Sequence, residues 1–362
     1  MSIRVLVVDD TVVFRRAVSD ALAGLPGVEV VGTASNGRLG MARLAELEPD
    51  LITLDVEMPE MNGIEVLEAM AAAESKAGVI MLSALTTRGG ELTVRALELG
   101  AFDFLTKPDA GTPQANLAEL RSRLLPIIRA FERRREIRSI LGGRSPRTVV
   151  AGELPTASPG LAKSLRRSGP PLVLIGVSTG GPGALARLVP ALPADLGAPV
   201  FIVQHMPALF TGPLAESLNK KSAIRVCEAR EGETAQPNCA YVAPGGRHMK
   251  LTAGGAREII IRITDDPPEN GCRPAVDYLF RSAALDFPGR SVAAVLTGMG
   301  KDGTAGLRML KRSGCFAIAQ DEASCVVFGM PNEAIQAGVV DTVAPLDAIA
   351  GVIVRSVREG KA

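Results

Sequence analysis

Apolar and polar residues alternate in short blocks along most of the chain, and the pattern changes repeatedly from that of a strand to that of a helix. In the first 120 residues, apolar runs predict strands at 3–8, 28–33, 51–54, 79–82 and 102–105. Helical patterns lie between these runs and begin near Val12, Gly37, Ile64 and Gly90. Such alternation is typical of a doubly wound parallel sheet, so the first module is predicted to have an α/β fold.

The same alternation returns after residue 170 and predicts a second module of the same class. Its strand patterns fall at 172–177, 200–204, 239–242, 258–263, 292–296 and 315–319. Its helical patterns fall at 183–189, 209–220, 276–284 and 303–313. We therefore predict two doubly wound parallel-sheet domains, the second of them Rossmann-like.

The segment that joins the two modules has a different composition. A last helical pattern begins near Thr112 and runs into the arginines at 133–135. Residues 142–169 are rich in Gly, Pro, Ser and Arg and show no sustained apolar period, which is typical of a linker. We predict a first domain at 1–122, a helical and basic segment that becomes a flexible linker at 123–169, and a second domain at 170–362.

The length and composition fit a folded protein of two domains, since the chain has 362 residues of which 47% are hydrophobic and 22% charged. The net charge of +1 conceals an uneven distribution. Residues 1–120 carry 9 basic and 18 acidic side chains, whereas residues 121–168 carry 12 and 3. The chain has no Trp and only 10 Phe and 2 Tyr to stack on bases. We therefore interpret the basic segment as a solvated charge run and expect no nucleic-acid partner.

The sequence also predicts the cellular compartment. It begins Met1-Ser2-Ile3-Arg4, without the pattern of a secretory signal, and no apolar run reaches the roughly 18 residues of a membrane span. The 5 cysteines form no Cys-x-x-Cys pair. We expect a reduced, cytoplasmic protein without membrane insertion, acting as a monomer.

Polar side chains follow four strands of the first module. Asp9 and Asp10 follow the first predicted strand, Asp55 the third, Ser83 the fourth and Lys107 the fifth. Because a parallel sheet brings these strand ends to one edge, the side chains are expected to meet there. Three carboxylates suit Mg²⁺, and beside the metal one of them can attack a phosphoryl group. Helix capping explains Asp10 alone but not polar residues at four strand ends.

These residues resemble the receiver domain of response regulators over about residues 2–122. The matching segments are Val7-Val8-Asp9-Asp10, Leu54-Asp55, Met58-Pro59, Asn62-Gly63, Ser83-Ala84 and Lys107-Pro108. The resemblance implies a flavodoxin-like fold in which Asp55 accepts the phosphoryl group. It also implies that Asp9, Asp10, Asp55 and the backbone carbonyl of Glu57 hold Mg²⁺. Ser83 and Lys107 would contact the phosphoryl oxygens, and Phe104 would be the switch aromatic.

Ser178 marks a second kind of chemistry. It follows the apolar run 172–177 and opens into Thr179-Gly180-Gly181. Such a turn is either a phosphate cradle of backbone N–H groups or a Gly-x-Ser-x-Gly nucleophile elbow. The glycine spacing matches no dinucleotide fingerprint, and no Gly-Lys-Ser/Thr follows, so the elbow is favoured.

The chain has two histidines, which shortens the search for a general base. His205 follows the strand next in sequence to that of Ser178, and neighbouring parallel strands lie about 4.8 Å apart. Asp302 follows the pattern at 292–296 and fits either a helix N-cap or the carboxylate that orients His205. The glycines around Met299 would let its backbone N–H face a developing oxyanion.

His248 is the alternative base. It lies in the turn-rich segment Pro244-Gly245-Gly246-Arg247-His248, where a surface role is expected. An α/β-hydrolase order of nucleophile, acid and histidine would need His248 with an acid such as Asp195, which is predicted to lie in a loop. We regard that triad as the weaker hypothesis. The histidines and cysteines also lack metal-ligand spacing, and we expect no cofactor in the second module.

With both modules in view, nearly the whole chain resembles the chemotaxis-type protein-glutamate methylesterases. Further matching segments are Ile175-Gly176-Val177-Ser178-Thr179-Gly180-Gly181-Pro182, Gln204-His205-Met206-Pro207 and Leu296-Thr297-Gly298-Met299-Gly300-Lys301-Asp302-Gly303. Two positions depart from the family pattern: Cys272 stands where a histidine is common, and Gly246 where an acidic residue is common.

The resemblance implies a serine hydrolase that demethylates glutamyl γ-methyl esters of chemoreceptors and deamidates receptor glutamines. A chemotaxis histidine kinase would phosphorylate the receiver, which packs over the active site until it is phosphorylated. Two alternatives stay open at this point. One is a non-enzymatic response regulator, and the other is a methylesterase of a chemosensory pathway other than motility.

Overall fold

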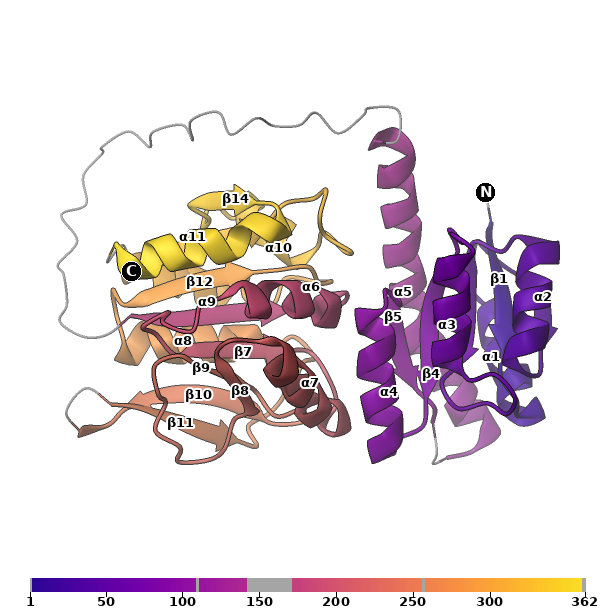
Figure 1. Ribbon diagram of the computed structural model, residues 1–362, viewed down its shortest axis with the longest axis horizontal. Coiled ribbons are helices and arrows are strands. Elements are labelled where there is room, and N and C mark those ends of the chain that lie inside the picture. The colour runs from indigo at the N-terminus through magenta and orange to yellow at the C-terminus, as the bar shows by residue number, and fades with distance from the viewer. Residues whose placement is uncertain (1, 109–110, 142–170, 256–257, 360–362) are drawn as a thin grey trace.

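The computed structural model describes residues 2–108, 111–141, 171–255 and 258–359, which form two α/β units, each built on its own parallel sheet (Figure 1). The predicted fold class is thereby confirmed. The linker expected at 142–169 lies outside the described residues.

The first unit has a five-stranded parallel sheet in the order β2-β1-β3-β4-β5. This is the flavodoxin-like order, in which the order of the strands across the sheet reverses between β1 and β3. The ends of β1 and β3 are therefore neighbours at the centre of the carboxyl edge. The elements are β1 (Ile3–Val8), α1 (Val12–Ala23), β2 (Val28–Ala34), α2 (Gly37–Leu47), β3 (Leu51–Asp55), α3 (Gly63–Ala72), β4 (Gly78–Ser83), α4 (Thr87–Glu98), β5 (Asp103–Thr106) and α5 (Pro113–Leu141).

Helix α5 extends the first unit beyond the boundary expected at residue 122. It continues without interruption to Leu141, with Pro126 inside it. Leu124, Ile128 and Phe131 are buried in the same core as β1 and β5, and the Phe131 ring meets Phe102 edge-on at 5.4 Å. The packed unit thus includes part of the segment that we expected to connect the modules, because the apolar face of α5 continues past residue 122.

The second unit has a seven-stranded sheet in the order β14-β13-β12-β6-β7-β9-β8, in which all pairs are parallel. Strands β10 and β11 form a separate antiparallel pair. The elements are β6 (Leu172–Val177), α6 (Gly181–Leu188), η1 (Val189–Ala191), β7 (Val200–Gln204), α7 (Ala208–Lys221), β8 (Arg225–Glu228), β9 (Cys239–Val242), β10 (His248–Ala253), β11 (Ile259–Thr264), α8 (Val276–Asp286), β12 (Ser291–Val295), α9 (Thr304–Arg312), β13 (Phe316–Gln320), α10 (Met330–Gln336), β14 (Thr342–Ala344) and α11 (Leu346–Arg358).

Several elements of the second unit were not predicted from the pattern: β8, β10, β14, α10 and α11. Strands β8 and β14 are short edge strands of four and three residues, and β8 has only two apolar residues between two charged ones. Strand β10 begins directly after a turn with two glycines, which made its sequence resemble a loop. Edge strands have few apolar neighbours, so their sequences carry a weaker signal.

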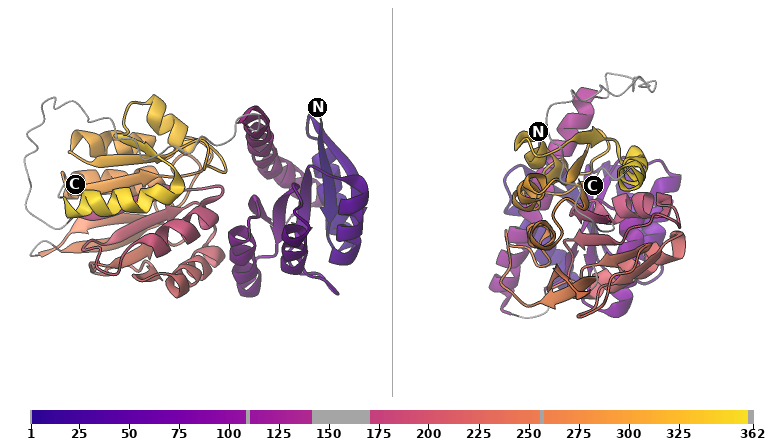
Figure 2. Two further views of the ribbon diagram at one scale, coloured as in Figure 1. Left: turned by 45° about the horizontal axis from the view of Figure 1, so that its top comes forward. Right: turned by 90° about the vertical axis from the view of Figure 1, so that its left-hand side faces the viewer.

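The first unit lies against the carboxyl edge of the second sheet, where α6 and α7 begin (Figures 1 and 2). Helix α4 packs against α7 and α6. The Phe104 ring on β5 meets Phe210 on α7 at 4.7 Å, and Glu98 at the end of α4 accepts hydrogen bonds from Ser217 (2.7 Å) and Lys221 (2.5 Å). The arrangement covers the edge at which the second unit carries its candidate catalytic residues.

A membrane span would need a long, apolar helix, and none of the described helices meets that requirement.

Candidate active site

Ser178 lies on a tight turn between β6 and α6. Its backbone N–H donates to the Thr297 carbonyl (3.0 Å), and its own carbonyl accepts from Gln204 Nε2 (3.0 Å). Gly180 has φ 76, and a Cβ there would lie 2.4 Å from Cβ of Val326. Only glycine fits both restrictions, so Gly180 permits the sharp turn that raises the Ser178 side chain above the sheet edge.

His205 lies beside Ser178 because β6 and β7 are adjacent parallel strands, with Val177 opposite Gln204. The backbone N–H of His205 donates to the Val177 carbonyl at 3.2 Å. Its ring Nε2 lies 2.8 Å from Asp302 Oδ2, and the side chains are 12% and 3% exposed. Three turns that are distant in sequence thus converge at one sheet edge.

Asp302 does not cap its own helix, since Gly303 is the residue before α9. Its carboxylate accepts instead from the backbone N–H groups of Val276 (2.6 Å), Asp277 (3.0 Å) and Gly303 (3.0 Å), two of which lie at the start of α8. Burial alone would raise the pKa of Asp302, but the hydrogen bond and charge of His205 and these N–H groups outweigh it and lower the pKa. Asp302 is therefore an anion at neutral pH, as an orienting carboxylate must be.

The surroundings of His205 raise the pKa of its imidazole. Burial disfavours the charged ring, but the hydrogen bonds to Asp302 and Cys272 overcome this effect and raise the pKa of His205 to about 9. These contacts therefore stabilise the protonated ring, as the orienting carboxylate of a triad does.

Ser178 and His205 line a common cavity of about 280 Å³ together with residues of the first unit, among them Asp103, Phe104 and Arg123. Thr179, the neighbour of Ser178, donates from Oγ1 to Asp103 Oδ2 at 2.9 Å. Within the described residues no hydrogen bond joins Ser178 Oγ to His205. The cavity is thus closed on one side by the first unit, and Ser178 and His205 share it without a hydrogen bond between them.

Met299 lies close to the nucleophile. Its neighbour Gly298 approaches Ser178 so closely that a Cβ on Gly298 would lie 2.7 Å from the Ser178 Cβ. In the described part of the chain the Met299 N–H donates to no protein acceptor. A free backbone donor beside a nucleophile is the arrangement that stabilises an oxyanion.

The alternative triad is excluded by geometry. His248 is fully buried on β10, which corrects our expectation of a surface role. It stacks on Tyr278 with ring centroids 4.3 Å apart, and its Nδ1 accepts from the Ala275 N–H at 3.2 Å. Asp195 is paired with Arg358 at 3.0 Å on the surface. Strand pairing with Ile259–Thr264 buries His248, and turn residues alone did not reveal that partner.

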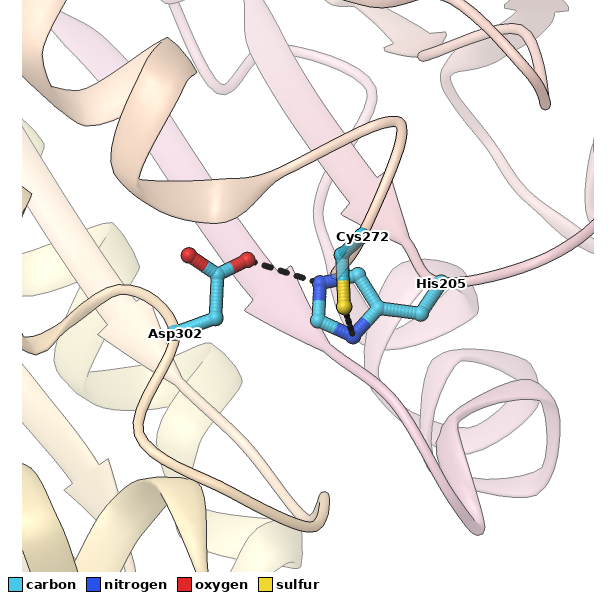
Figure 3. Close-up of side chains that lie close together, drawn as sticks. All are labelled: His205, Cys272 and Asp302. Carbon is cyan, nitrogen blue, oxygen red and sulfur yellow. Dashed lines mark hydrogen bonds and ion pairs between the residues drawn. The ribbon is translucent and has the colours of Figure 1, made fainter. Parts of the chain in front are cut away.

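Cys272 is the departure that affects the site directly. Its Sγ lies 3.5 Å from His205 Nδ1, the ring nitrogen that does not contact Asp302 (Figure 3). Gly246, the other departure, lies in an exposed turn with φ 75. Sequence comparison identified Cys272 as unusual, but only the fold places its thiol against the imidazole.

The acidic residues of the first unit also meet. Ligand oxygens of Asp9, Asp10 and Asp55 lie within 4.8 Å of one another, and Lys107 Nζ lies 2.6 Å from Asp55 and 2.8 Å from Asp9. Burial raises the pKa of Asp55 to about 6, although the hydrogen bond from Lys107 acts in the opposite direction. A cluster of carboxylate oxygens in which Asp9 is fully buried fits a hard divalent cation such as Mg²⁺.

The other residues that we predicted for the phosphorylation site make hydrogen bonds within the first unit or contact the second unit. Ser83 Oγ donates to the Gly89 and Ala84 carbonyls at 3.3 and 3.2 Å, and the Glu57 N–H donates to Asp55 Oδ1 at 3.4 Å. Phe104 contacts Phe210 of the second unit. Sequence reasoning missed Asp103 and Thr179, because a hydrogen bond between two units leaves no local pattern in either.

Each of the two units matches a known protein family. Residues 5–115 match the family model described as response regulator receiver domain, and residues 173–353 match that described as CheB methylesterase. The chain is 49% identical to a protein-glutamate methylesterase/protein-glutamine glutaminase of Desulfotalea psychrophila, with 99% of each chain covered. It is 41% identical to a protein of the same name from Bacillus subtilis, again with 99% of each covered. The crystal structure of the Thermotoga maritima CheB methylesterase catalytic domain aligns with a TM-score of 0.51 and 40% identity, over 52% of this chain and 99% of that one.

Proposed function

The chain belongs to the family of CheB methylesterases that carry a response-regulator receiver domain, and from this premise we propose that Ser178, His205 and Asp302 form its catalytic triad. It is a protein-glutamate methylesterase and protein-glutamine glutaminase. The observation that supports the triad best is the 2.8 Å contact between His205 and the buried Asp302, beside Ser178 in one cavity.

The proposed reaction has two steps. Ser178 Oγ attacks the carbonyl of a glutamyl γ-methyl ester while His205 accepts the hydroxyl proton, and the Met299 N–H donates to the resulting oxyanion. His205 then protonates the departing methanol. Water hydrolyses the acyl-serine to a glutamate and regenerates Ser178. A glutamine amide follows the same route with ammonia as the leaving group.

The first unit is proposed to control access to this site. Asp103, Phe104 and Arg123 close the cavity of Ser178, so a receptor helix cannot enter while the units are in contact. We propose that a chemotaxis histidine kinase phosphorylates Asp55, with Ser83 and Lys107 placed to contact the phosphoryl oxygens. Phe104 links that site to the interface, because it lies on β5 and contacts Phe210.

Magnesium is proposed as the cofactor of phosphorylation. Asp9, Asp10, Asp55 and the carbonyl of Glu57 would hold it, and the bound ion would neutralise negative charge on the phosphoryl group. Lys107 contributes a second positive charge from the protein itself, and it already contacts both Asp9 and Asp55. The proposed substrates are the cytoplasmic helices of chemoreceptors, so we propose that the enzyme acts in the cytoplasm. We also propose that it acts as a monomer.

The test is release of methanol from methylated receptor, measured with and without a small-molecule phosphodonor. Phosphodonor is expected to raise the rate, and Ser178→Ala is expected to lower kcat by at least ~10³-fold, on the scale of other triads. Circular dichroism and the unfolding midpoint should be those of the parent protein, since Ser178 donates no buried side-chain hydrogen bond. A purified variant with near-parental activity would disprove the assignment of Ser178.

A further inference from the structure

His205, Cys272 and Asp302 form a cluster whose chemistry the hydrolysis does not use in full. Their ligand atoms all lie within 4.8 Å of one another (Figure 3). Asp302 Oδ2 lies 2.8 Å from His205 Nε2, and Cys272 Sγ lies 3.5 Å from Nδ1 of the same ring. Serine hydrolysis requires the histidine and the carboxylate but has no role for the thiol.

We propose that these three side chains form a binding site for Zn²⁺, and that occupation of this site reversibly stops the esterase. The inference rests on the proposed function, since it takes His205 and Asp302 as catalytic groups. Zinc is bound by one nitrogen, one sulfur and one carboxylate oxygen at about 2.0–2.3 Å. In the structure the carboxylate and the thiol contact different nitrogens of the ring, so the side chains must rotate until one nitrogen, the sulfur and one oxygen face a single ion.

The donor set selects the metal. A thiolate and an imidazole favour a borderline or soft divalent ion, whereas Mg²⁺ prefers oxygen ligands only. The thiolate and the Asp302 carboxylate carry two negative charges, which balance the charge of Zn²⁺ in a site that is largely buried. The all-oxygen cluster of Asp9, Asp10 and Asp55 in the first unit has the opposite preference. The chain thus separates two kinds of divalent ion between its two units.

The cluster is held in place by the surrounding backbone. Asp302 Oδ1 accepts hydrogen bonds from Asn270 Nδ2 (3.2 Å) and from the Asp277 and Gly303 N–H groups (each 3.0 Å). These bonds fix the carboxylate with Oδ2 toward His205. Outer-shell hydrogen bonds of this kind orient ligands in established metal sites.

The turn that carries Cys272 is fixed in the same way. Glu269 and Cys272 exchange two backbone hydrogen bonds (3.1 and 2.8 Å), and Asn270 ties the turn to Asp302. Cys272 itself is partly exposed and lies between exposed residues, Gly271 and Arg273. A small ion can therefore reach the thiol from solvent, by a side other than the cavity that the first unit covers.

Occupation has a direct chemical consequence. Zinc uses a lone pair of the imidazole, and the ring can then no longer accept the Ser178 proton. Zinc also replaces the contact between His205 and Asp302 that orients the ring. Hydrolysis is therefore expected to stop at full occupancy and to return when a chelator removes the metal.

The experiment uses the full-length protein, stripped with a chelator and assayed in millimolar Mg²⁺ so that the receiver site is filled. Zinc is titrated against methanol release, and Cd²⁺ binding is followed separately by the ultraviolet charge-transfer absorbance of a cadmium thiolate. The parent protein is expected to be inhibited and to develop the absorbance at one equivalent. Cys272→Ser is expected to lose the absorbance and to need at least ~10-fold more Zn²⁺ for half-inhibition of its own metal-free rate, a loss of about 1.4 kcal/mol in binding.

Cys227→Ser is the matched control, because Cys227 is also a partly exposed free thiol but lies on β8. It is expected to behave like the parent protein. Equal zinc sensitivity of the parent and Cys272→Ser, or cadmium absorbance that persists without Cys272, would overturn the proposal. Absence of methanol release from the metal-free parent would instead disprove the proposed function, while cadmium binding would still decide whether the site exists.

Discussion

At the scale of single residues, Asp302 combines two tasks. In the proposed triad it orients His205, and its carboxylate accepts hydrogen bonds from the first backbone N–H groups of α8, which places the positive end of that helix beside the carboxylate. Asp277, in the first turn of α8, accepts in turn from the Gly306 N–H of α9 at 2.7 Å. The carboxylate that we propose as catalytic is therefore also part of the packing of two helices.

Asp302→Asn tests both tasks. The amide cannot supply an anion to the imidazole, so kcat is expected to fall by ~10²–10⁴-fold, as when the triad aspartate of other serine hydrolases is replaced. Its NH₂ group also faces backbone donors, which should cost about 1–3 kcal/mol of unfolding free energy. Both are measured on one preparation, by methanol release and urea unfolding. Asp195→Asn, at an exposed ion pair, is the control, and unchanged kcat in Asp302→Asn would refute the role.

We expect Asp103 to make the contact between the units depend on pH. Burial raises its pKa to about 6 in the closed arrangement, although the Phe104 N–H and Thr179 hydroxyl hydrogen bonds oppose this. A group whose pKa is raised by closure stabilises the closed form at low pH, and this contribution is lost as pH rises through 6. The difference of about 2 pKa units corresponds to about 3 kcal/mol at most.

We therefore expect the protein to be more compact at pH 5 than at pH 7.5, as measured by small-angle X-ray scattering. Asp103→Asn carries no charge to desolvate and is expected to stay compact at both pH values, with lower basal activity at pH 7.5. A radius of gyration that changes equally with pH in both proteins would show that another group is responsible.

At the scale of elements, α4 and α7 carry much of the contact between the units. Glu98, at the end of α4, is 12% exposed and bonds to both Ser217 and Lys221 of α7. The pair is thus more protected than an ordinary surface ion pair. The same helix connects β4, which ends at Ser83, to β5, which carries Phe104. A change at the phosphorylation site can therefore reach the interface through one short stretch of chain.

Glu98→Gln tests this contact. Loss of the charge should weaken docking by about 1 kcal/mol, since Lys221 is partly exposed. Basal methanol release without phosphodonor is then expected to rise roughly fivefold, while the rate with phosphodonor changes little. Glu91→Gln alters an exposed residue of the same helix and serves as the control. A basal rate that Glu98→Gln leaves unchanged would mean that this contact does not hold the units together.

At the scale of the whole molecule, the protein is an enzyme whose active edge is covered by its own regulatory unit. The cavity of Ser178 has walls from both units, so each unit alone leaves it open. Contacts between domains of one chain resemble transient interfaces and can separate at modest cost. Control by phosphorylation therefore needs only a shift in the equilibrium between the form with the two units in contact and the form with the units apart.

A fragment of residues 170–362 tests this view. Without the first unit the cavity is open, so the fragment is expected to exceed the basal activity of the full-length protein by roughly tenfold, which is an opening free energy of about 1.4 kcal/mol. It should also be indifferent to phosphodonor. Rates are compared in parallel methanol-release assays, and a full-length protein that is faster than the fragment without phosphodonor would contradict inhibition by the first unit.

The amino-acid pattern was sufficient to predict the two parallel sheets and the residues at their carboxyl edges. Alternating apolar runs report the period and burial of strands, and a parallel sheet must bring the ends of its strands together. For this reason Ser178, His205 and Asp302 could be proposed as neighbours although up to 124 positions separate them. The acidic residues of the first unit followed from the same rule.

The folded structure was needed to show how surfaces without a local pattern meet. It buried His248 under a partner strand, extended the first unit along α5, and joined Asp103 to Thr179 across the two units. It also placed the Cys272 thiol against the His205 ring. These contacts depend on how loops and faces pack after the sheets have formed. Local sequence does not encode these contacts, because the residues around each side chain are compatible with several ways of packing the loops and faces.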